Sequence, residues 1–171
     1  MIDVLKDTLS KVNDWVKYAE AKNAANIAFC SASIWGIFRV MSSSQNLDSY
    51  IHAYLMMSIS LLAIGLCISF ISFIPKLNTP WFKVPKREKG ENLLYFGVAR
   101  KYSAKSYVEE LYDGQPENSD NYKVDLMYAD QIIINSKVAW AKFKQFDFAV
   151  VFTLSAILSP LFILILKVCK K

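Results

Sequence analysis

The feature that most constrains this chain is an uncharged run at residues 53–75, AYLMMSISLLAIGLCISFISFIP. As a helix this run would be about 34 Å long, because each residue adds about 1.5 Å. That length exceeds the hydrocarbon core of a bilayer, which is about 30 Å thick. A buried helix of a soluble protein would need a partner core that the remaining polar sequence does not supply. We therefore expect residues 53–75 to span a membrane.

A second uncharged run covers residues 148–166, FAVVFTLSAILSPLFILIL, and contains Pro160. Proline is tolerated in membrane helices when nearby hydroxyls satisfy the carbonyl that it leaves free. Ser155 and Ser159 stand close enough in sequence to do so. We expect a kinked span here. The three lysines in the tail that follows leave open a helix that stops short of the far face.

Residues 24–41 form a third, less hydrophobic candidate, with Arg39 near its end. Arginine at such a position can extend toward the headgroups. A helical hairpin with residues 53–75 is the economical arrangement, and an interfacial helix is the alternative. The hairpin predicts that residues 24–41 have a face of small side chains, which packs closely against other helices. Its residues are Ala24, Ala25, Ala28, Ala32 and Gly36.

The distribution of lysine and arginine predicts the orientation. Residues 1–22 carry four lysines, residues 42–52 carry no lysine or arginine, and residues 76–145 carry twelve. Short loops rich in these residues stay in the cytoplasm. The N-terminus and residues 76–145 are therefore predicted to be cytoplasmic, and residues 42–52 to face outside. The first residues lack the apolar stretch of a signal peptide.

The segment at residues 2–20 has an apolar stripe at helical spacing. The stripe consists of Ile2, Leu5, Leu9, Val12 and Val16. An amphipathic helix with this stripe either lies on the membrane surface or packs against the rest of the cytoplasmic part.

After residue 75, Pro75, Pro80 and Pro85 predict an exit loop, in which Trp81 and Phe82 suit the membrane interface. A short apolar segment follows at residues 93–97, where Gly97 is predicted to allow a turn. Next comes a short helix that begins at the N-cap Ser103 and ends at Asp113-Gly114-Gln115-Pro116.

From about Asp120 the helical period continues without a break into the last span. The fold class is therefore an all-α integral membrane protein with about three transmembrane helices. A small cytoplasmic helical insertion precedes the last, long helix. The predicted parts are an N-terminal helix at 1–22, a membrane hairpin at 23–75, a cytoplasmic segment at 76–145 and a final helix with its tail at 146–171.

Catalytic and metal-binding patterns are missing from the sequence. The lone histidine, His52, is expected at the mouth of a span, and the three cysteines are expected to be free thiols because they lack metal-ligand spacing. The acidic face at Glu109, Glu110 and Asp113 is typical of the solvent-exposed side of a helix. We expect no enzyme, no catalytic residue, no metal, no cofactor and no nucleic-acid binding. The net charge of +5 is best explained by the orientation of the chain in the membrane and by contact with lipid headgroups.

Four features follow one another along the chain: Ala19-Glu20-Ala21-Lys22 before the first span, Asn92-Leu93-Leu94-Tyr95-Phe96-Gly97, a helix with Tyr107 and Leu111, and a long helix with Asp130, Gln131, Ser136-Lys137 and Lys142. In this order and spacing they resemble the Pycsar transmembrane effector family of bacterial antiphage systems. The resemblance covers roughly residues 15–160.

This resemblance implies an inner-membrane effector that responds to a cyclic nucleotide made by a neighbouring cyclase after phage infection. Such effectors are expected to form homo-oligomers in the lipid bilayer, to disrupt or permeabilise it and to stop the infected cell. The implied signal is cUMP or cCMP, or an oligonucleotide messenger. The chain has no recognisable cyclic-nucleotide-binding β-roll, so either residues 76–145 form the pocket or a partner senses the signal.

Seven residues are the candidates for such a pocket, because a cyclic nucleotide has one phosphate, a ribose edge and a flat base. They are Arg100, Lys101 and Lys137 for the phosphate, Asn92 for a polar edge, and Tyr95, Tyr107 and Trp140 for stacking. Each also has a structural interpretation: Asn92 as a turn or cap residue, the aromatic residues as a small core, and the cations as surface or headgroup contacts. A membrane-anchored scaffold subunit, or a small oligomeric channel without nucleotide sensing, is the alternative function.

Overall fold

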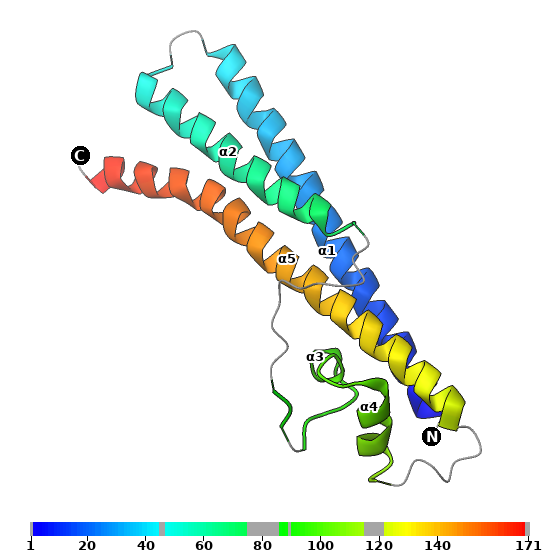
Figure 1. The fold of residues 1–171 in the computed structure, drawn as a ribbon. Coiled ribbons are helices and arrows are strands. Elements are labelled where there is room, and N and C mark those ends of the chain that lie inside the picture. Colours follow the sequence, from blue (N-terminus) through cyan, green and yellow to red (C-terminus); the bar gives the residue numbers. More distant parts are fainter. Residues whose placement is uncertain (1, 45–46, 75–85, 89, 115–121, 170–171) are drawn as a thin grey trace. The chain divides into compact units, whose positions relative to one another are not determined.

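The computed structural model describes residues 2–44, 47–74, 86–88, 90–114 and 122–169, with side chains up to residue 159. This part of the chain forms five helices and no strand, which confirms the all-α prediction for it. The helices are α1 (Ile2–Ser43), α2 (Ser49–Ile71), α3 (Phe96–Ala99), α4 (Ala104–Leu111) and α5 (Tyr122–Cys169) (Figure 1). The predicted exit loop with Trp81 and Phe82, and the loop that contains Gln115 and Pro116, lie outside the described residues.

Helix α1 joins the two predicted helical segments, 2–20 and 24–41, in one helix of 42 residues. It contains no proline, and Gly36 is its single glycine, so its sequence offers no break. Helices α1 and α2 are both long and apolar enough to cross a bilayer, by length and composition.

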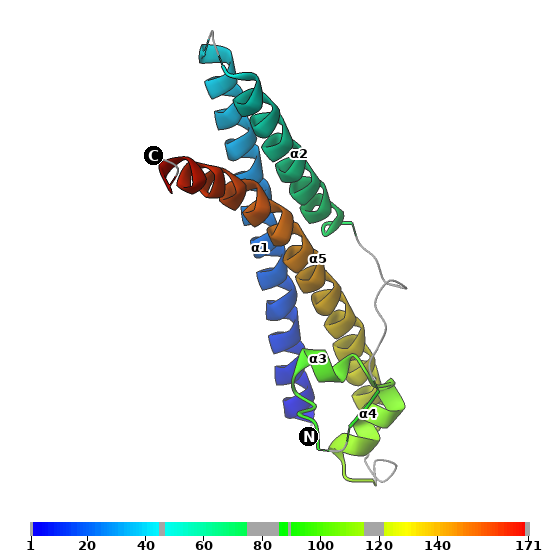
Figure 2. The same cartoon turned by 90° about the vertical axis from the view of Figure 1, so that its left-hand side faces the viewer.

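Helix α5 is 48 residues long and confirms the prediction of one continuous helix from the polar region into the last apolar run. It continues through Pro160, and its ribbon curves toward the C-terminal end (Figure 2). The Ser159 hydroxyl donates to the Ala156 carbonyl at 3.5 Å, and the Tyr54 and Ser159 hydroxyls lie 2.8 Å apart. A proline frees the carbonyl four residues earlier, so Ser159 satisfies the carbonyl of Ala156 as predicted.

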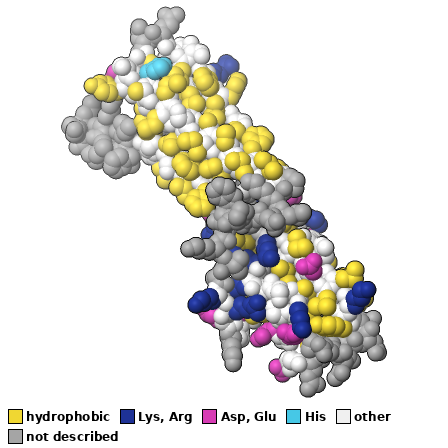
Figure 3. Space-filling view, in the orientation of Figure 1, with side chains coloured by type: hydrophobic (Ala, Val, Ile, Leu, Met, Phe, Trp, Pro, Cys, Tyr) yellow, Lys and Arg dark blue, Asp and Glu magenta, His cyan; other side chains and the backbone are white. Residues whose placement is uncertain are grey.

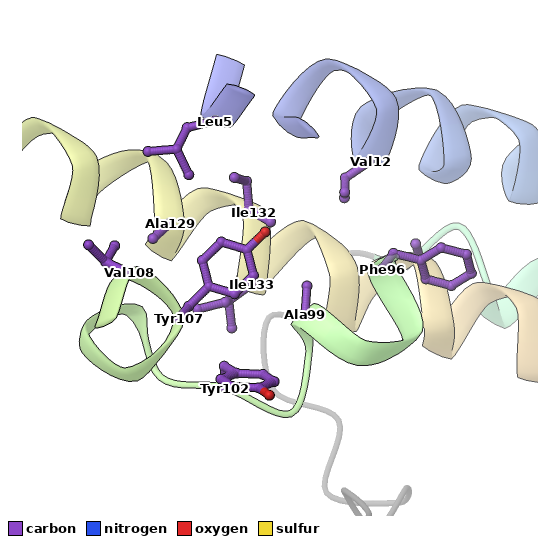
Figure 4. Close-up of a cluster of buried hydrophobic side chains, with 11 residues drawn as sticks. Leu5, Val12, Phe96, Ala99, Tyr102, Tyr107, Val108, Ala129, Ile132 and Ile133 are labelled. Carbon is purple, nitrogen blue, oxygen red and sulfur yellow. The ribbon is translucent and has the colours of Figure 1, made fainter. Parts of the chain in front are cut away.

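The chain divides into two compact units: unit 1 consists of Met1–Ala19 and Pro75–Phe143, and unit 2 of Glu20–Ile74 and Lys144–Lys171. In unit 1 the apolar stripe of α1 packs against α3, α4 and α5 (Figure 4). Of the two predicted positions for this helix, the structure shows packing against the rest of its unit. The buried apolar core consists of Leu5, Val12, Phe96, Ala99, Tyr102, Tyr107, Val108, Ala129, Ile132, Ile133 and Ala139.

The predicted N-cap of α4 is confirmed, and it closes a capping box. The Ser103 hydroxyl accepts from the Ser106 amide at 3.3 Å, and the Ser106 hydroxyl accepts from the Ser103 amide at 3.0 Å. Both bonds satisfy amides that a helix start leaves free. The helix ends before Asp113 and Gly114, which adopt left-handed φ angles of 53° and 95°.

Gly97 has another role than the predicted turn. It lies inside α3, and a Cβ atom built on it would come within 2.4 Å of the Tyr95 ring. A larger residue here would therefore force the half-exposed Tyr95 ring to move. The prediction that Gly97 allows a turn was wrong in its reason, because Gly97 lies within a helix and is not among the glycines with a positive φ angle.

Unit 2 packs α2 against the second part of α1 and the second part of α5. On the face that Figure 3 shows, large apolar side chains gather over this unit, whereas lysine and arginine side chains gather over unit 1. The predicted small face of α1 was wrong as an intrachain contact, because Ala24, Ala25, Ala28 and Ala32 are exposed and Gly36 has no neighbour within 4 Å of an added Cβ. The close contact is instead at Gly65 of α2, where an added Cβ would lie 3.0 Å from the Ala149 carbonyl oxygen.

Candidate functional site: an aromatic cluster with a buried arginine

The candidate site in unit 1 is built around the ring of Phe96. This ring lies 5.5 Å from the Trp15 ring, 5.6 Å from the Phe143 ring and 6.4 Å from the Trp140 ring, measured between centroids. The Tyr95 ring is at 4.8 Å. Three separate parts of the chain therefore meet here: α1, the start of α3 and the middle of α5. The Phe143 ring is stacked on Phe96 and the other three rings are tilted against it, and aromatic pairs at such distances are favourable.

Arg100 is the charged member of the cluster. Only 5% of its surface is exposed, and its guanidinium carbon lies 3.8 Å from the centroid of the Trp140 ring. Its Nε donates to the Gly97 carbonyl at 3.1 Å. Burial lowers the pKa of Arg100, although arginine stays charged in proteins. The interpretation of Arg100 as a surface or headgroup contact was wrong.

A buried cation normally has an anionic partner, because desolvation of an unpaired charge is costly. Within the described part of the chain, no carboxylate forms an ion pair with Arg100. Its contacts there include the Trp140 ring and the Gly97 carbonyl. A planar guanidinium in this state is well suited to bind a phosphate or carboxylate group through two hydrogen bonds.

A shallow surface cavity of about 460 Å³, widely open to solvent, lies beside the same cluster. The described residues that line it are Lys11, Asp14, Trp15 and Tyr18, all on α1. Trp15 and Tyr18 are 43% and 50% exposed, so about half of the surface of each residue remains accessible. The volume lies in the range of about 300–1,000 Å³ that small-ligand sites usually have. Exposed ring faces of this kind can stack on a flat base.

Three of the predicted site residues already have structural roles. The Asn92 side chain accepts from the Leu94 amide at 3.0 Å, as the turn interpretation expects. The Lys101 amine pairs with Glu91, and this bond lowers the pKa of the Glu91 carboxyl. Tyr107 is fully buried and donates to the Leu93 carbonyl at 2.9 Å. Burial raises the pKa of Tyr107 to about 12.

The structure brings together three of the other four predicted residues. Tyr95, Arg100 and Trp140 all belong to the Phe96 cluster. Lys137 lies one turn before Trp140 on α5 and is exposed. The cluster thus contains a cation and stacking rings, whereas Asn92, Lys101 and Tyr107 support the fold around it.

The sequence interpretation missed the α1 part of the site. The apolar stripe predicted for this helix did not include Trp15 and Tyr18, and neither residue was given a role. The available signal was a pair of aromatic residues, three positions apart, outside the apolar stripe. Such residues share one helix face, and the solvated face of a helix rarely needs two large rings.

The part of the chain that the structure describes contains neither a cluster of metal-ligand side chains nor a disulfide. No group of three or more histidine, cysteine, aspartate or glutamate side chains comes together there. Cys30 and Cys67 are free thiols, as predicted, and His52 is exposed near the start of α2.

Comparison with known proteins gives one consistent result. A family model described as Pycsar effector protein domain matches residues 4–168. The chain is 34% identical over 146 residues to the Pycsar effector protein RsPycTM of a Rhizobium species, covering 82% of this chain and 81% of that protein. The comparison with solved structures gave no match.

Proposed function

This chain belongs to the Pycsar effector family, and from that premise we propose that it is an antiphage effector that senses a cyclic nucleotide and permeabilises the bacterial inner membrane. A neighbouring cyclase supplies the nucleotide after infection. The effector then acts as a homo-oligomer in the lipid bilayer and arrests the growth of the infected cell or kills it. It performs no enzymatic reaction.

Membrane insertion is supported by α1 and α2, which are long and apolar enough to span, and by the composition of unit 2. The third span is the apolar run 148–166 within α5. Unit 1 is placed in the cytoplasm and residues 42–52 outside, because lysine and arginine gather in the former and are missing from the latter. The protein is thus a multi-pass protein whose unit 1 faces the source of the nucleotide.

Nucleotide sensing rests on one observation: Arg100 is a buried cation that no described carboxylate neutralises. In the proposed complex the phosphate binds Arg100, and the base stacks on rings of the Phe96 cluster. The cavity at Trp15 and Tyr18 provides the space for the base and ribose. A charge-assisted hydrogen bond to a buried phosphate would contribute about 1.5–3 kcal/mol.

Calorimetry with cUMP and cCMP on the full chain in detergent tests this assignment. We expect Arg100→Met to weaken binding at least about tenfold, because it keeps an unbranched apolar stem and removes the charged guanidinium. Lys105→Met is the matched control, since Lys105 is an exposed cation on α4 outside the cluster. Trp15→Leu should weaken binding through loss of stacking.

Dye release from liposomes that contain the full chain tests the consequence of binding. Nucleotide should trigger release by the wild type and by Lys105→Met, and Arg100→Met should require higher nucleotide concentrations. If the wild type neither binds these nucleotides nor releases dye in their presence, direct sensing is wrong. Equal binding by Arg100→Met and the wild type would remove Arg100 from the site.

A further inference from the structure

The interior of unit 2 is more polar than its surface. Its exposed residues include many large apolar side chains, among them Phe29, Trp35, Met57, Phe70, Val151 and Leu158. Its described buried residues are small or polar, with Leu62 as the large exception: Asn23, Asn26 and Cys30 of α1, Ser58, Gly65 and Ser69 of α2, Ser72 just after α2, and Ala149, Thr153 and Ala156 of α5. Polar groups that are kept from both water and lipid must bond to one another.

Four of these residues form one hydrogen-bonded layer across all three helices. The Asn26 amide donates to the Ser69 hydroxyl at 2.9 Å, and the Thr153 hydroxyl donates to the Asn26 carbonyl oxygen at 3.1 Å. The Cys30 sulfur lies 3.3 Å from the Thr153 oxygen. None of the four is more than 7% exposed. We call Asn26, Cys30, Ser69 and Thr153 the polar layer.

Thr153 has two alternative partners in this layer. Its single hydroxyl hydrogen can reach the Asn26 oxygen at 3.1 Å or, within its own helix, the Ala149 carbonyl at 3.0 Å. The hydroxyl therefore stays satisfied whether or not α1 remains bound to α5. An element with two satisfied arrangements is what a two-state transition requires.

The depth of the layer places it near one membrane face. Asn26 lies two residues inside the predicted start of the first span, Thr153 five residues inside the third, and Ser69 six residues from the end of the second. These positions correspond to depths of about 3, 8 and 9 Å. The three independent estimates agree that the layer lies in the third of the hydrocarbon core nearest the predicted cytoplasmic face.

We propose that the polar layer is a latch that holds the three helices closed, and that its opening turns these polar side chains toward the water-filled path in the active assembly. In the closed state Thr153 bonds to Asn26 across the helices. In the open state Thr153 bonds to Ala149, and water reaches Asn26, Ser69 and Cys30. This inference rests on the proposed permeabilising function.

The first test compares dye release from liposomes without any nucleotide. Thr153→Val keeps the shape of the side chain and removes the hydroxyl, so it should shift the population toward the open state by about three- to twentyfold, as expected for one interhelical bond in a membrane. Thr153→Ser keeps the hydroxyl and should behave as the wild type. If Thr153→Val is helical, inserted and no leakier than the wild type, the latch is wrong.

The second test uses Cys30 as a reporter and does not depend on the folding of a Thr153 variant. In a Cys67→Ala, Cys169→Ala chain, a charged, water-soluble thiol reagent should leave Cys30 unmodified at rest and modify it when leakage is triggered. The matched control, Cys30→Ala with Cys169→Ala, retains only Cys67, which is exposed on the outside of α2 and should stay unmodified in both states. Leakage without modification of Cys30 would overturn the latch.

These outcomes separate the two proposals. A wild type that ignores cUMP and cCMP, combined with a leaky Thr153→Val whose Cys30 is modified, would reject the nucleotide assignment and keep the latch. Nucleotide-triggered leakage with a silent Thr153→Val and an unmodified Cys30 would reject the latch and keep the proposed function.

Discussion

At the scale of single residues, truncation of Phe96 should lower stability far more than truncation of its near neighbour Leu94. Phe96 is 6% exposed and contacts rings from α1 and α5, whereas Leu94 is 46% exposed. Truncation of a buried phenylalanine costs about 3–5 kcal/mol. Phe96→Ala should therefore unfold unit 1, and Leu94→Ala should change its stability by no more than about 0.5 kcal/mol.

Limited proteolysis and the near-ultraviolet dichroism of the aromatic side chains would measure this difference, with membrane insertion followed in parallel by fractionation. Both variants should still insert, because neither residue belongs to a candidate span. Loss of insertion in Phe96→Ala would mean that unit 1 is needed for membrane integration. A stable unit 1 in that variant would contradict the assigned role of the ring.

Tyr107 predicts how unit 1 responds to alkaline pH. Its pKa is about 12 in the folded chain against an ordinary value of 10.0. Between these values the folded state holds a proton that the unfolded state has lost. The contribution of Tyr107 to the free energy of unfolding is therefore fully present below about pH 10 and falls as the pH rises toward 12. Two pKa units correspond to roughly 3 kcal/mol.

Denaturant titrations of the wild type and Tyr107→Phe between pH 9 and 12 would show this effect. Tyr107→Phe should be less stable by about 1 kcal/mol at pH 9, because it lacks the bond to the Leu93 carbonyl. It should also lose less stability above pH 10 than the wild type does. Parallel curves for the two proteins would mean that Tyr107 is not the responsible group.

At the scale of helices, Gly65 sets how closely α2 approaches α5. An added Cβ would lie 2.9 Å from the Thr153 hydroxyl oxygen and 3.0 Å from a backbone oxygen of α5. Because backbone cannot move aside as a long side chain can, Gly65→Val should destabilise unit 2 by about 1–3 kcal/mol. Gly36→Val is the control, since its Cβ would meet nothing within 4 Å. Thermal unfolding in detergent should separate them, and equal midpoints would contradict this contact.

Features of a helix that depend on residues close in sequence could be predicted, and features that depend on distant helices could not. The cap at Ser103 and the unbroken course of α5 depend on neighbouring residues, so local chemistry predicted both. Which small residues make contact depends on distant helices. Ala24 and Ala28 have the pattern of a packing face, yet the contact is at Gly65, because Asn26 and Cys30 turn the other side of α1 inward.

For the whole molecule, two consequences of the tertiary arrangement lay beyond sequence reasoning. Arg100 looked like a surface cation, and only the fold places it over Trp140. The polar layer draws on Asn26, Ser69 and Thr153, which are far apart in the chain and ordinary one by one. The uncharged runs and the lysine distribution, by contrast, need no tertiary information to predict spans and orientation.

The predicted orientation can be tested on the whole protein with single cysteines in a cysteine-free chain. Ser44→Cys lies in the connection after α1, and Lys105→Cys lies on α4; both positions are exposed. A membrane-impermeant maleimide added to intact spheroplasts should label Ser44→Cys and should reach Lys105→Cys only after permeabilisation. The reverse pattern would invert the topology.

Helices α1 and α5 each pass from unit 1 into unit 2 without a break, α1 after Ala19 and α5 after Phe143. The number of residues at each crossing therefore sets the rotation, about the helix axis, of the residues that follow. One inserted residue turns everything that follows by about 100°, whereas seven turn it by only about 20° short of two full turns. One alanine inserted after Ala19 should disrupt unit 2, and seven in each helix should be tolerated far better. Heritable insertions and deletions should accordingly avoid both crossings, or occur there in steps close to seven.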